Sequence, residues 1–457
     1  MTSALTAIVS MLIVLGIMVL VHEFGHFLVA KWCGVRVEVF SIGFPPRLFG
    51  FRRGDTDYRI SLLPLGGYVK MAGGEPGDPR TGDPAELTSR PRWQRILISF
   101  AGPAANFILA FLLMAGLYMT YNQVPNFETG PAVTDLVPPG SAAWKAGIRP
   151  GDRIVRFGNE KNPTWEQVEN HAAANANATV PITLQRTVNG QPQQIQTSLF
   201  ISDPSHSDDF TIDSLGLIAK WQDGPLGVRD VIPGDPAANA GLKAGDKIVA
   251  IDGHAIHSVN AITAWLQQSQ GKPVTLEVQR GSQQLNITPT PIWGDNGAGT
   301  MGYRLGFYPT LPPFHIEQLS LPKAVQASIR SNMQYSGLIL HVLRRMVSRP
   351  SNVQQLSGPI GIAKATGEAV SMPGWKPIIG LMAGISLNLG ILNLLPFPIL
   401  DGGTILFLLI ESTLRRDINQ DLKERVYQVA FVMIVLLFVF IMVNDVAKLN
   451  LLPKLRL

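Results

Sequence analysis

The chain has 457 residues, of which only 16% are charged, with a formal net charge of +5 and a single cysteine. About a quarter of the residues of a typical soluble protein are charged, so this composition, with its ordinary globular stretches, excludes a disordered chain, a fibrous repeat and a simple cytosolic enzyme. One cysteine excludes an intrachain disulfide and a cysteine-based zinc finger or iron–sulfur cluster. The basic excess is small, and we expect no nucleic-acid partner.

Four long stretches carry no charged residue, and each is long enough to cross about 30 Å of hydrocarbon as a helix. A buried core helix can explain one such stretch, but four in a single chain favour a membrane protein. The first has neither a basic start nor a small-residue cleavage site, so we predict a retained helix rather than a signal peptide. The stretches are 4–21, 96–121, 377–400 and 426–443.

Lysine and arginine gather between the first two stretches, in residues 31–95, and none follows until Lys145. Because cytoplasmic loops of membrane proteins are enriched in these residues, we expect 31–95 in the cytoplasm and 122–376 outside. Four spans then place both termini outside as well, although the basic tail (Lys448, Lys454 and Arg456) favours the opposite side.

A repeated pattern lies between the second and third stretches, where residues 135–155 and 230–249 are similar. Each copy predicts a strand, a short helix that ends at a glycine, a Gly-Asp turn and an alternating strand, and closes with a Leu-Gly pair. This pattern resembles bacterial, circularly permuted PDZ domains, in which a peptide adds as a strand beside the Leu-Gly strand. The alternative is that these modules bind no peptide and only fill space over the membrane.

A metal-binding pattern follows the first apolar stretch, where His22-Glu23-Phe24-Gly25-His26 forms H-E-x-x-H. On a helix, residues four apart share one face, so both imidazoles can reach one metal ion, with Glu23 placed to take a proton from a bound water. Ionisable residues inside a membrane segment mark functional sites by default. Zinc suits two histidines and a carboxylate.

Asp401 is the candidate third ligand, an isolated acid at the end of the third apolar stretch. Its alternative role is a helix cap, because Gly402 and Gly403 follow. The first and third spans run in the same direction, so Asp401 should reach the same, cytoplasmic-side depth as the histidines. Pro396 and Pro398 are expected to break the third helix just before it.

Asparagine side chains lie within the second and third apolar stretches. Asn388 and Asn393 can hydrogen-bond a substrate backbone or an oxyanion, and they can equally join helices; both interpretations stay open. Segment 102–106, Gly-Pro-Ala-Ala-Asn, offers small residues for close helix packing and one amide facing the site, and we interpret it mainly as packing.

Together, the H-E-x-x-H motif, segment 102–106, the two PDZ-like copies and segment 393–403 resemble the site-2 protease family over essentially the whole chain. The resemblance implies an intramembrane zinc metalloprotease, with His22, His26 and Asp401 as Zn²⁺ ligands and Glu23 as acid–base. It implies a multi-pass protein of the bacterial inner membrane that contacts lipid. The implied substrate is the membrane segment of a single-pass protein such as an anti-sigma factor, cut after a first protease has trimmed its periplasmic part, and possible further substrates are signal-peptide remnants.

The alternating residues 35–40 and 58–62, extended by 66–70, predict strands in the cytoplasmic loop. Such strands can hold an unwound substrate by edge pairing, or they form a plain surface hairpin. The bridge contains an amphipathic stretch, 324–346, which predicts a helix on the membrane surface or a solvent-exposed linker helix.

The predicted fold is a polytopic α-helical membrane protein with four transmembrane helices, a cytoplasmic β-hairpin-like loop and two periplasmic α+β PDZ-like domains. Rival interpretations are a catalytically inactive membrane-anchored PDZ scaffold, which would bind no metal, and a metal transporter, which would need ionisable residues along several spans. The expected divisions are 1–34 (first transmembrane helix), 35–95 (cytoplasmic loop), 96–121 (second helix), 122–220 and 221–310 (PDZ-like domains), 311–376 (amphipathic bridge), 377–410 (third helix with Asp401), 411–425 (cytoplasmic loop), 426–447 (fourth helix) and 448–457 (periplasmic tail).

Overall fold

A computed structural model describes residues 4–74, 81–175, 177–202, 212–295, 301–348 and 358–448. The chain divides into two compact units. We call Met1–Asn122 with Gln318–Leu457 the helical unit, and Gln123–Glu317 the β-rich unit. Apart from its first residue, the tail predicted at 448–457 lies outside the described residues.

The helical unit contains four helices long and apolar enough to cross a membrane, in Ala4–Trp32, Arg92–Thr120, Lys376–Asn393 and Asp421–Val443. They overlap the four uncharged stretches of the sequence. The elements of this unit are α1 (Ala4–Trp32), β1 (Val37–Arg53), β2 (Thr56–Met71), η1 (Leu87–Ser89), α2 (Arg92–Thr120), α8 (Leu321–Ser348), α9 (Pro359–Ser371), α10 (Lys376–Asn393), α11 (Asp401–Leu414) and α12 (Gln420–Lys448).

The third apolar stretch breaks where Pro396 and Pro398 were expected to break it, so the division 377–410 contains two helices. The helix α10 ends at Asn393, residues 394–400 are non-helical, and α11 begins at Asp401. The break coincides with Pro396 and Pro398, which cannot donate the backbone hydrogen bonds that a helix requires. The following loop is also shorter than the predicted 411–425, because α11 continues to Leu414 and α12 begins at Gln420.

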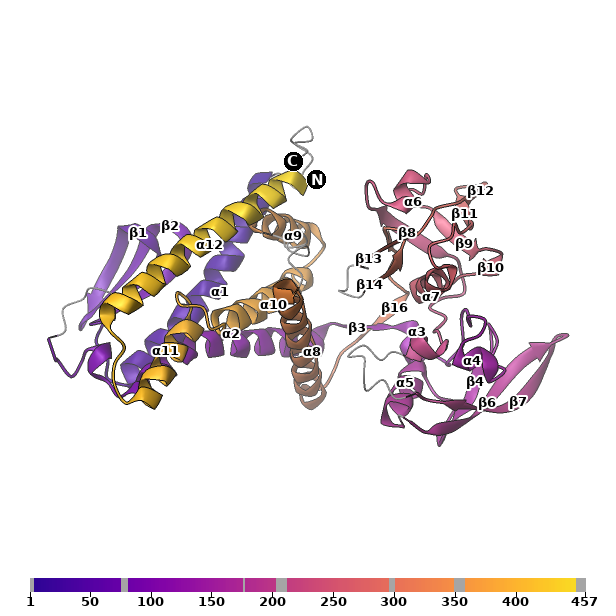
Figure 1. Cartoon of the computed structure of the whole chain (residues 1–457), viewed down its shortest axis with the longest axis horizontal. Coiled ribbons are helices and arrows are strands. Elements are labelled where there is room, and N and C mark those ends of the chain that lie inside the picture. The colour runs from indigo at the N-terminus through magenta and orange to yellow at the C-terminus, as the bar shows by residue number, and fades with distance from the viewer. Residues whose placement is uncertain are drawn as a thin grey trace. The chain divides into compact units, whose positions relative to one another are not determined.

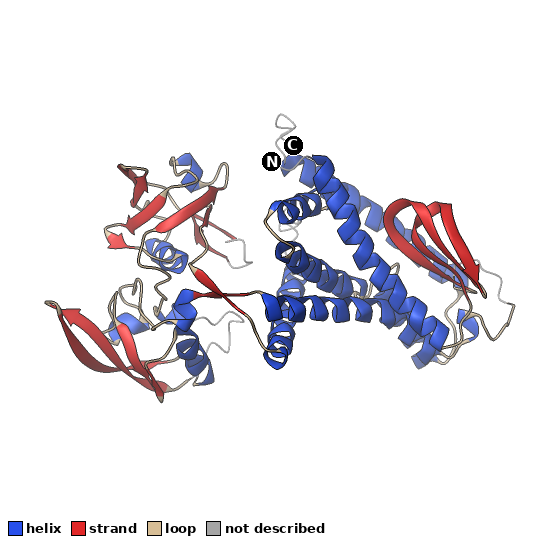
Figure 2. Ribbon diagram, turned by 180° about the vertical axis from the view of Figure 1, so that it is seen from behind, coloured by secondary structure: helices blue, strands red, loops and turns tan. Residues whose placement is uncertain are grey.

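Strands β1 and β2 form an antiparallel pair at one end of the helical unit (Figures 1 and 2). Each strand changes direction along its length, so segment 37–42 pairs with residues 57–60 on one side and with residues 67–71 on the other. Residues 47–53 then pair with 56–61. The predicted hairpin is therefore longer than the alternating residues indicated, and its outer edges are the segments 67–71 and 47–53.

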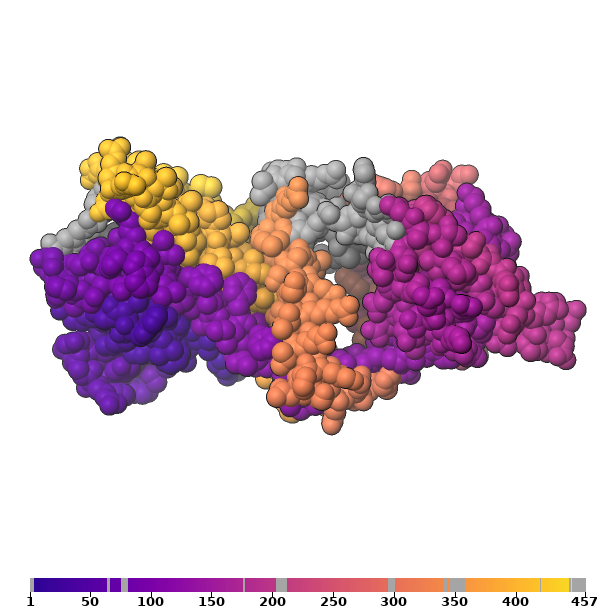
Figure 3. All heavy atoms as spheres, turned by 90° about the horizontal axis from the view of Figure 1, so that it is seen from below, coloured from indigo at the N-terminus to yellow at the C-terminus, as the bar shows by residue number. Residues whose placement is uncertain are grey.

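The helix α2 lies at the centre of the helical unit, in contact with α1, α8, α10 and α11. The amphipathic helix expected in the bridge is α8, which crosses α2 (Figures 1 and 3). The Ser328 hydroxyl donates to the Phe111 carbonyl at 2.8 Å, and the hydroxyls of Tyr118 and Ser331 lie 2.6 Å apart. These polar contacts fasten α8 to the second half of α2.

The bridge contains a second helix, α9, that the sequence analysis did not predict. It packs against α1, and its N-terminus is held by the Asp445 carboxylate of α12. That carboxylate accepts hydrogen bonds from the backbone amides of Gly358, Ile360 and Gly361 at 3.0, 3.1 and 3.2 Å. An acid from another helix thus serves as the N-terminal cap of α9.

The β-rich unit contains the two repeated modules. Its helices are α3 (Asn126–Thr129), α4 (Ala142–Lys145), α5 (Trp165–Ala174), η2 (Ile212–Leu215), α6 (Pro236–Asn239) and α7 (Val259–Ser269). Its strands are β3 (Asn122–Pro125), β4 (Arg153–Phe157), β5 (Glu160–Lys161), β6 (Thr179–Val188), β7 (Gln191–Phe200), β8 (Leu226–Val231), β9 (Lys247–Ile251), β10 (His254–Ala255), β11 (Leu276–Arg280), β12 (Gln283–Ile287), β13 (Ile292–Asp295), β14 (Met301–Arg304), β15 (Phe307–Pro309) and β16 (Phe314–Glu317).

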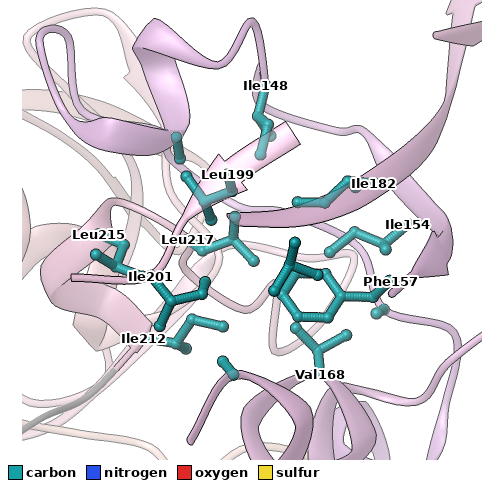
Figure 4. Packing of buried hydrophobic residues seen from close by; sticks show 14 of the residues in the cluster. Ile148, Ile154, Phe157, Val168, Ile182, Leu199, Ile201, Ile212, Leu215 and Leu217 are labelled. Carbon is teal, nitrogen blue, oxygen red and sulfur yellow. The ribbon is translucent and has the colours of Figure 1, made fainter. Parts of the chain in front are cut away.

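Each module has its own sheet and hydrophobic core. The first sheet has the order β5-β4-β6-β7, and the second has the order β12-β11-β9-β8-β15 with β10 beside β9. In the first core, Phe157 packs among Ile154, Val168 and other aliphatic side chains (Figure 4). The second core gathers around Ile248 and Leu266 in the same way.

The same ion pair, between a buried aspartate and a partly exposed arginine, recurs in both modules and was not foreseen. In the first, the Arg186 guanidinium binds both carboxylate oxygens of Asp152 at 2.7 Å, and in the second Arg280 does the same to Asp246. The Arg280 guanidinium also lowers the pKa of the Asp246 carboxyl below its ordinary value. Each arginine braces the Gly-Asp turn against a neighbouring strand, which accounts for the aspartate in both copies of the repeat.

The two modules also contact each other within the β-rich unit. The Asp135 carboxylate of the first module is almost fully buried and accepts hydrogen bonds from the backbone amide of His257 at 3.1 Å and the Ser258 hydroxyl at 2.7 Å. The His257 ring nitrogen Nδ1 lies 2.7 Å from the same carboxylate. Since Ser258 caps α7, this contact ties the start of that helix to the first module.

Candidate active site

The histidines of the H-E-x-x-H motif lie one turn apart on α1 and are 6% and 8% exposed. Their Nε2 atoms are 3.2 Å apart. Asp401 approaches both rings, with Oδ2 at 3.1 Å from His22 Nε2 and Oδ1 at 3.4 Å from His26 Nε2. The structure therefore brings together the three side chains that the sequence analysis proposed as ligands.

The spacing of these atoms suits a small divalent cation. Ligand atoms about 2.0–2.1 Å from a tetrahedral zinc ion lie roughly 3.3 Å from one another. The 3.2 Å between the two Nε2 atoms is close to that value, and each ring has a different Asp401 oxygen at a similar distance, Oδ2 at 3.1 Å from His22 and Oδ1 at 3.4 Å from His26. With one ligand atom taken from each residue, the three atoms lie within 4.8 Å of one another. Two imidazoles and one carboxylate also form a donor set of catalytic zinc sites, which leave one position open.

Gly102 of α2 provides the room for the two imidazoles. A Cβ at this position would lie 2.3 Å from His26 Nε2 and 2.8 Å from His22 Cε1. Both distances are shorter than van der Waals contact, so any larger residue would displace the rings. The close helix packing expected from segment 102–106 therefore acts at the site itself.

The N-terminus of α11 positions Asp401. Leu400, not Asp401, is the capping residue of α11, so the alternative role of Asp401 as a helix cap is wrong. A Cβ at Gly402 would lie 2.2 Å from the Leu394 carbonyl oxygen, and one at Gly403 would lie 2.1 Å from that of Phe397. The two glycines thus let the broken segment 394–400 fold closely onto the start of α11.

Glu23 is half-buried on α1, between the two histidines in sequence. Its Cγ atom lies 3.7 Å from the position that a Cβ would take at Gly67 of β2. The outer edge of the β1–β2 sheet therefore passes beside the acid of the motif.

The two candidate asparagines of α10 differ in their placement. Asn393, the last residue of the helix, has its Nδ2 atom 3.5 Å from His22 Nε2. Asn388 is exposed, and it lies about 140° around the helix axis from Asn393 at 3.6 residues per turn. The structure brings Asn393 to the site and places Asn388 on another face of α10.

Asn106 of α2 contacts the site more directly than the sequence analysis expected. Its side chain is fully buried, and its Nδ2 atom lies 3.1 Å from His22 Nδ1. The sequence feature that could have indicated this contact is the spacing of four residues between Gly102 and Asn106, which places both on one helix face.

A family model described as Peptidase family M50 matches residues 10–437. The chain belongs to peptidase family M50, the site-2 protease family. The Regulator of sigma E protease from Salmonella typhi is 32% identical over 462 residues, which cover 98% of this chain and 100% of the relative. The Escherichia coli K12 protein named Regulator of sigma-E protease has the same identity and coverage. A Haemophilus influenzae relative with that name is 30% identical over 458 residues, again covering 98% and 100%.

A Vibrio cholerae relative, 31% identical over 98% of this chain and all of its own length, carries a provisional zinc metalloprotease name. Among solved structures, the PDZ domain of an SdrC-like protein from Listeria monocytogenes is 26% identical, covers 19% of this chain and 90% of that domain, and has a TM-score of 0.17. The family assignment makes this chain a zinc metalloprotease of the inner membrane, and the inactive scaffold and the transporter lose their support.

Proposed function

We propose that this protein hydrolyses a peptide bond within the membrane-spanning segment of a single-pass protein. The observation that carries the proposal is the meeting of His22, His26 and Asp401 inside a bundle of helices that are apolar enough to span a membrane. Peptide hydrolysis at such a site needs a substrate that is itself in the bilayer. The basic residues of 31–95 favour a cytoplasmic location for that loop and for the nearby site, with the β-rich unit in the periplasm.

His22, His26 and Asp401 are the residues that would hold zinc. When bound, zinc supplies a Lewis acid that polarises a carbonyl and lowers the pKa of water. Glu23 accepts the proton of the attacking water and returns it to the leaving amine nitrogen. Asn393, beside His22, donates its amide hydrogens to the substrate backbone or to the developing oxyanion.

A transmembrane helix conceals its amide bonds in hydrogen bonds, so the substrate must unwind before hydrolysis. In the part of the chain that the structure describes, the strand partner of the outer segment 67–71 of β2 is β1, on one side, and Gly67 lies beside Glu23. An unwound substrate that adds as a strand to this edge would pass within reach of Glu23. The edge-pairing role therefore fits better than a plain surface hairpin.

The substrate class follows from the relatives. Several proteins similar along nearly the whole chain are named as regulators of sigma E. We propose an anti-sigma factor as the substrate, cut after its periplasmic part has been trimmed, with the two modules selecting or filtering substrates before they reach the bundle. Signal-peptide remnants are further candidate substrates, because their cleavage would be the same hydrolysis of a peptide bond within the membrane.

The test compares the wild-type protein with Glu23→Gln in detergent or vesicles, using a model single-pass substrate. We expect the variant to keep its zinc and lose cleavage, because the ligands stay while the proton acceptor is removed. Cleavage by Glu23→Gln at the wild-type rate would refute the role of Glu23. A wild-type protein without zinc, or cleavage insensitive to a chelator, would refute the metalloprotease mechanism.

A further inference from the structure

Asn106 is a buried amide whose hydrogen bonding is incomplete as placed. Its Nδ2 atom lies 3.1 Å from His22 Nδ1, while its Oδ1 atom is buried without a hydrogen-bond partner. A buried acceptor without a partner costs about 1–3 kcal/mol. The opposite orientation of the Asn106 amide, with its oxygen and nitrogen exchanged, would therefore be expected to cost less.

The Nε2 atom of His22 determines whether its Nδ1 atom, which faces Asn106, carries a hydrogen. His22 Nε2 faces Asp401 Oδ2 at 3.1 Å and His26 Nε2 at 3.2 Å, so it is the atom available to a metal. A neutral imidazole that binds a metal through Nε2 carries its hydrogen on Nδ1. A donor at Nδ1 cannot bond to the donor Nδ2 of an amide, but it can bond to the carbonyl oxygen.

Rotation of the Asn106 amide by a half-turn exchanges the positions of its oxygen and its nitrogen. The two ends of a carboxamide have nearly the same shape, and the hydrogen-bond network decides which end is oxygen. With Oδ1 toward His22, the imidazole Nδ1–H gains an acceptor and the buried oxygen gains a donor. We propose that Asn106 is the positioning residue of His22: it accepts the Nδ1–H bond and fixes the tautomer and ring orientation in which Nε2 binds zinc.

The partner histidine has an equivalent acceptor. His26 Nδ1 lies 2.7 Å from the backbone carbonyl of Ile98, which can only accept, so His26 Nδ1 carries the hydrogen. Both acceptors come from α2, and the Ser386 hydroxyl of α10 holds the backbone carbonyl of Asn106 at 2.9 Å. One helix thus orients both imidazoles that α1 presents.

The inference rests on the proposed role of His22 as a ligand, and zinc affinity tests it without using activity. The full-length protein in detergent is titrated with zinc in competition with a chromophoric chelator. Asn106→Leu keeps the size but removes the acceptor, and we expect about 10- to 100-fold weaker zinc binding. Asn106→Asp keeps an acceptor toward Nδ1–H, and we expect affinity within a few-fold of wild type.

Ser386→Ala is the matched control, because it removes a hydrogen bond to Asn106 without touching the imidazole, and it should bind zinc as wild type does. Cobalt-substituted samples report the same effect, with a changed visible spectrum only in Asn106→Leu. If Asn106→Leu does not fold, Asn106→Ala takes its place with the same expectation. This inference is overturned if Asn106→Leu binds zinc with wild-type affinity, or if Asn106→Leu and Asn106→Asp lose equal amounts of zinc affinity. If the wild-type protein does not bind zinc, the proposed function is overturned instead.

Discussion

Asp401 Oδ2 lies 3.1 Å from His22 Nε2, although the two residues come from opposite ends of the chain. The contact depends on two local features: a helix that presents His22 and His26 on one face, and a helix break that lets α11 begin at Asp401. Neither α1 nor α11 alone supplies a complete set of ligands. The site therefore forms only when the helical unit is assembled.

Replacement of Asp401 by Asn should weaken zinc retention more than the roughly 10- to 100-fold effect of losing an outer-shell partner. The amide keeps the shape of the side chain but lacks the negative charge that binds the cation. Metal analysis after dialysis against a chelator measures the effect, with Asp417→Asn as the control, since Asp417 pairs with Arg92 instead. Unchanged zinc content in the Asp401→Asn protein would show that another residue is the third ligand.

Gly102→Ala should disrupt the site although it adds a single methyl group. Its Cβ would lie 2.3 Å from His26 Nε2, so the rings must move out of their present spacing. We expect zinc affinity to fall by about 10-fold or more, together with cleavage. The control is Gly116→Ala on the same helix, where a Cβ meets nothing within 4 Å. Equal zinc binding by the two alanine variants would mean that the imidazoles relax without cost.

Asp445→Ala should loosen α9 from α12. Three backbone amides at the start of α9 would lose their acceptor, and loss of a helix cap costs about 1–2 kcal/mol. We expect faster hydrogen exchange in residues 358–364 and a lower thermal midpoint in detergent. Glu368→Ala serves as the control, because Glu368 is an exposed acid of the same helix that pairs only loosely with Lys364, at 3.9 Å. Unchanged exchange in the Asp445→Ala protein would contradict the capping role.

Much of the candidate site could be predicted from the sequence, because it depends on local spacing patterns and on the direction in which the chain crosses the membrane. The spacing of His22 and His26 gives a shared helix face, the prolines before Asp401 give the break, and the equal direction of the first and third spans gives the common depth. Each of these arguments needs no knowledge of the other side chains around the site.

The features that sequence reasoning missed depend on tertiary packing. The function of Asn106 follows from its place opposite His22, and a buried amide in an apolar helix has many other possible partners. Asp445 lies just beyond the uncharged stretch 426–443, and only the fold shows that it caps α9. The helix α9 itself was missed because Lys364 and Glu368 interrupt its apolar residues, so it has no signal of a membrane span.

The stability of the β-rich unit should depend on pH through Asp213 of η2. Burial raises the pKa of its carboxyl to about 6, with a further contribution from the nearby Glu169, while Asn260 donates a hydrogen bond to it at 2.8 Å. An ordinary aspartate has a pKa of about 3.9, so between about pH 4 and 6 the folded state binds a proton that the unfolded state has released. The contribution of Asp213 to stability is therefore greatest below this window and falls as the pH rises through it.

Asp213→Asn should remove this dependence, because the amide is uncharged at every pH and can still accept from Asn260. We expect the variant to be more stable than wild type at pH 7.5, by on the order of 2 kcal/mol, and nearly equal to it at pH 4. Hydrogen exchange of residues 212–219 in the full-length protein, corrected for intrinsic rates, measures the difference. Asp223→Asn is the control, since that carboxylate is exposed beside Lys220 and should leave the protection of 212–219 unchanged. Equal protection of wild type and Asp213→Asn at pH 7.5 would show that the buried carboxyl costs the folded unit nothing.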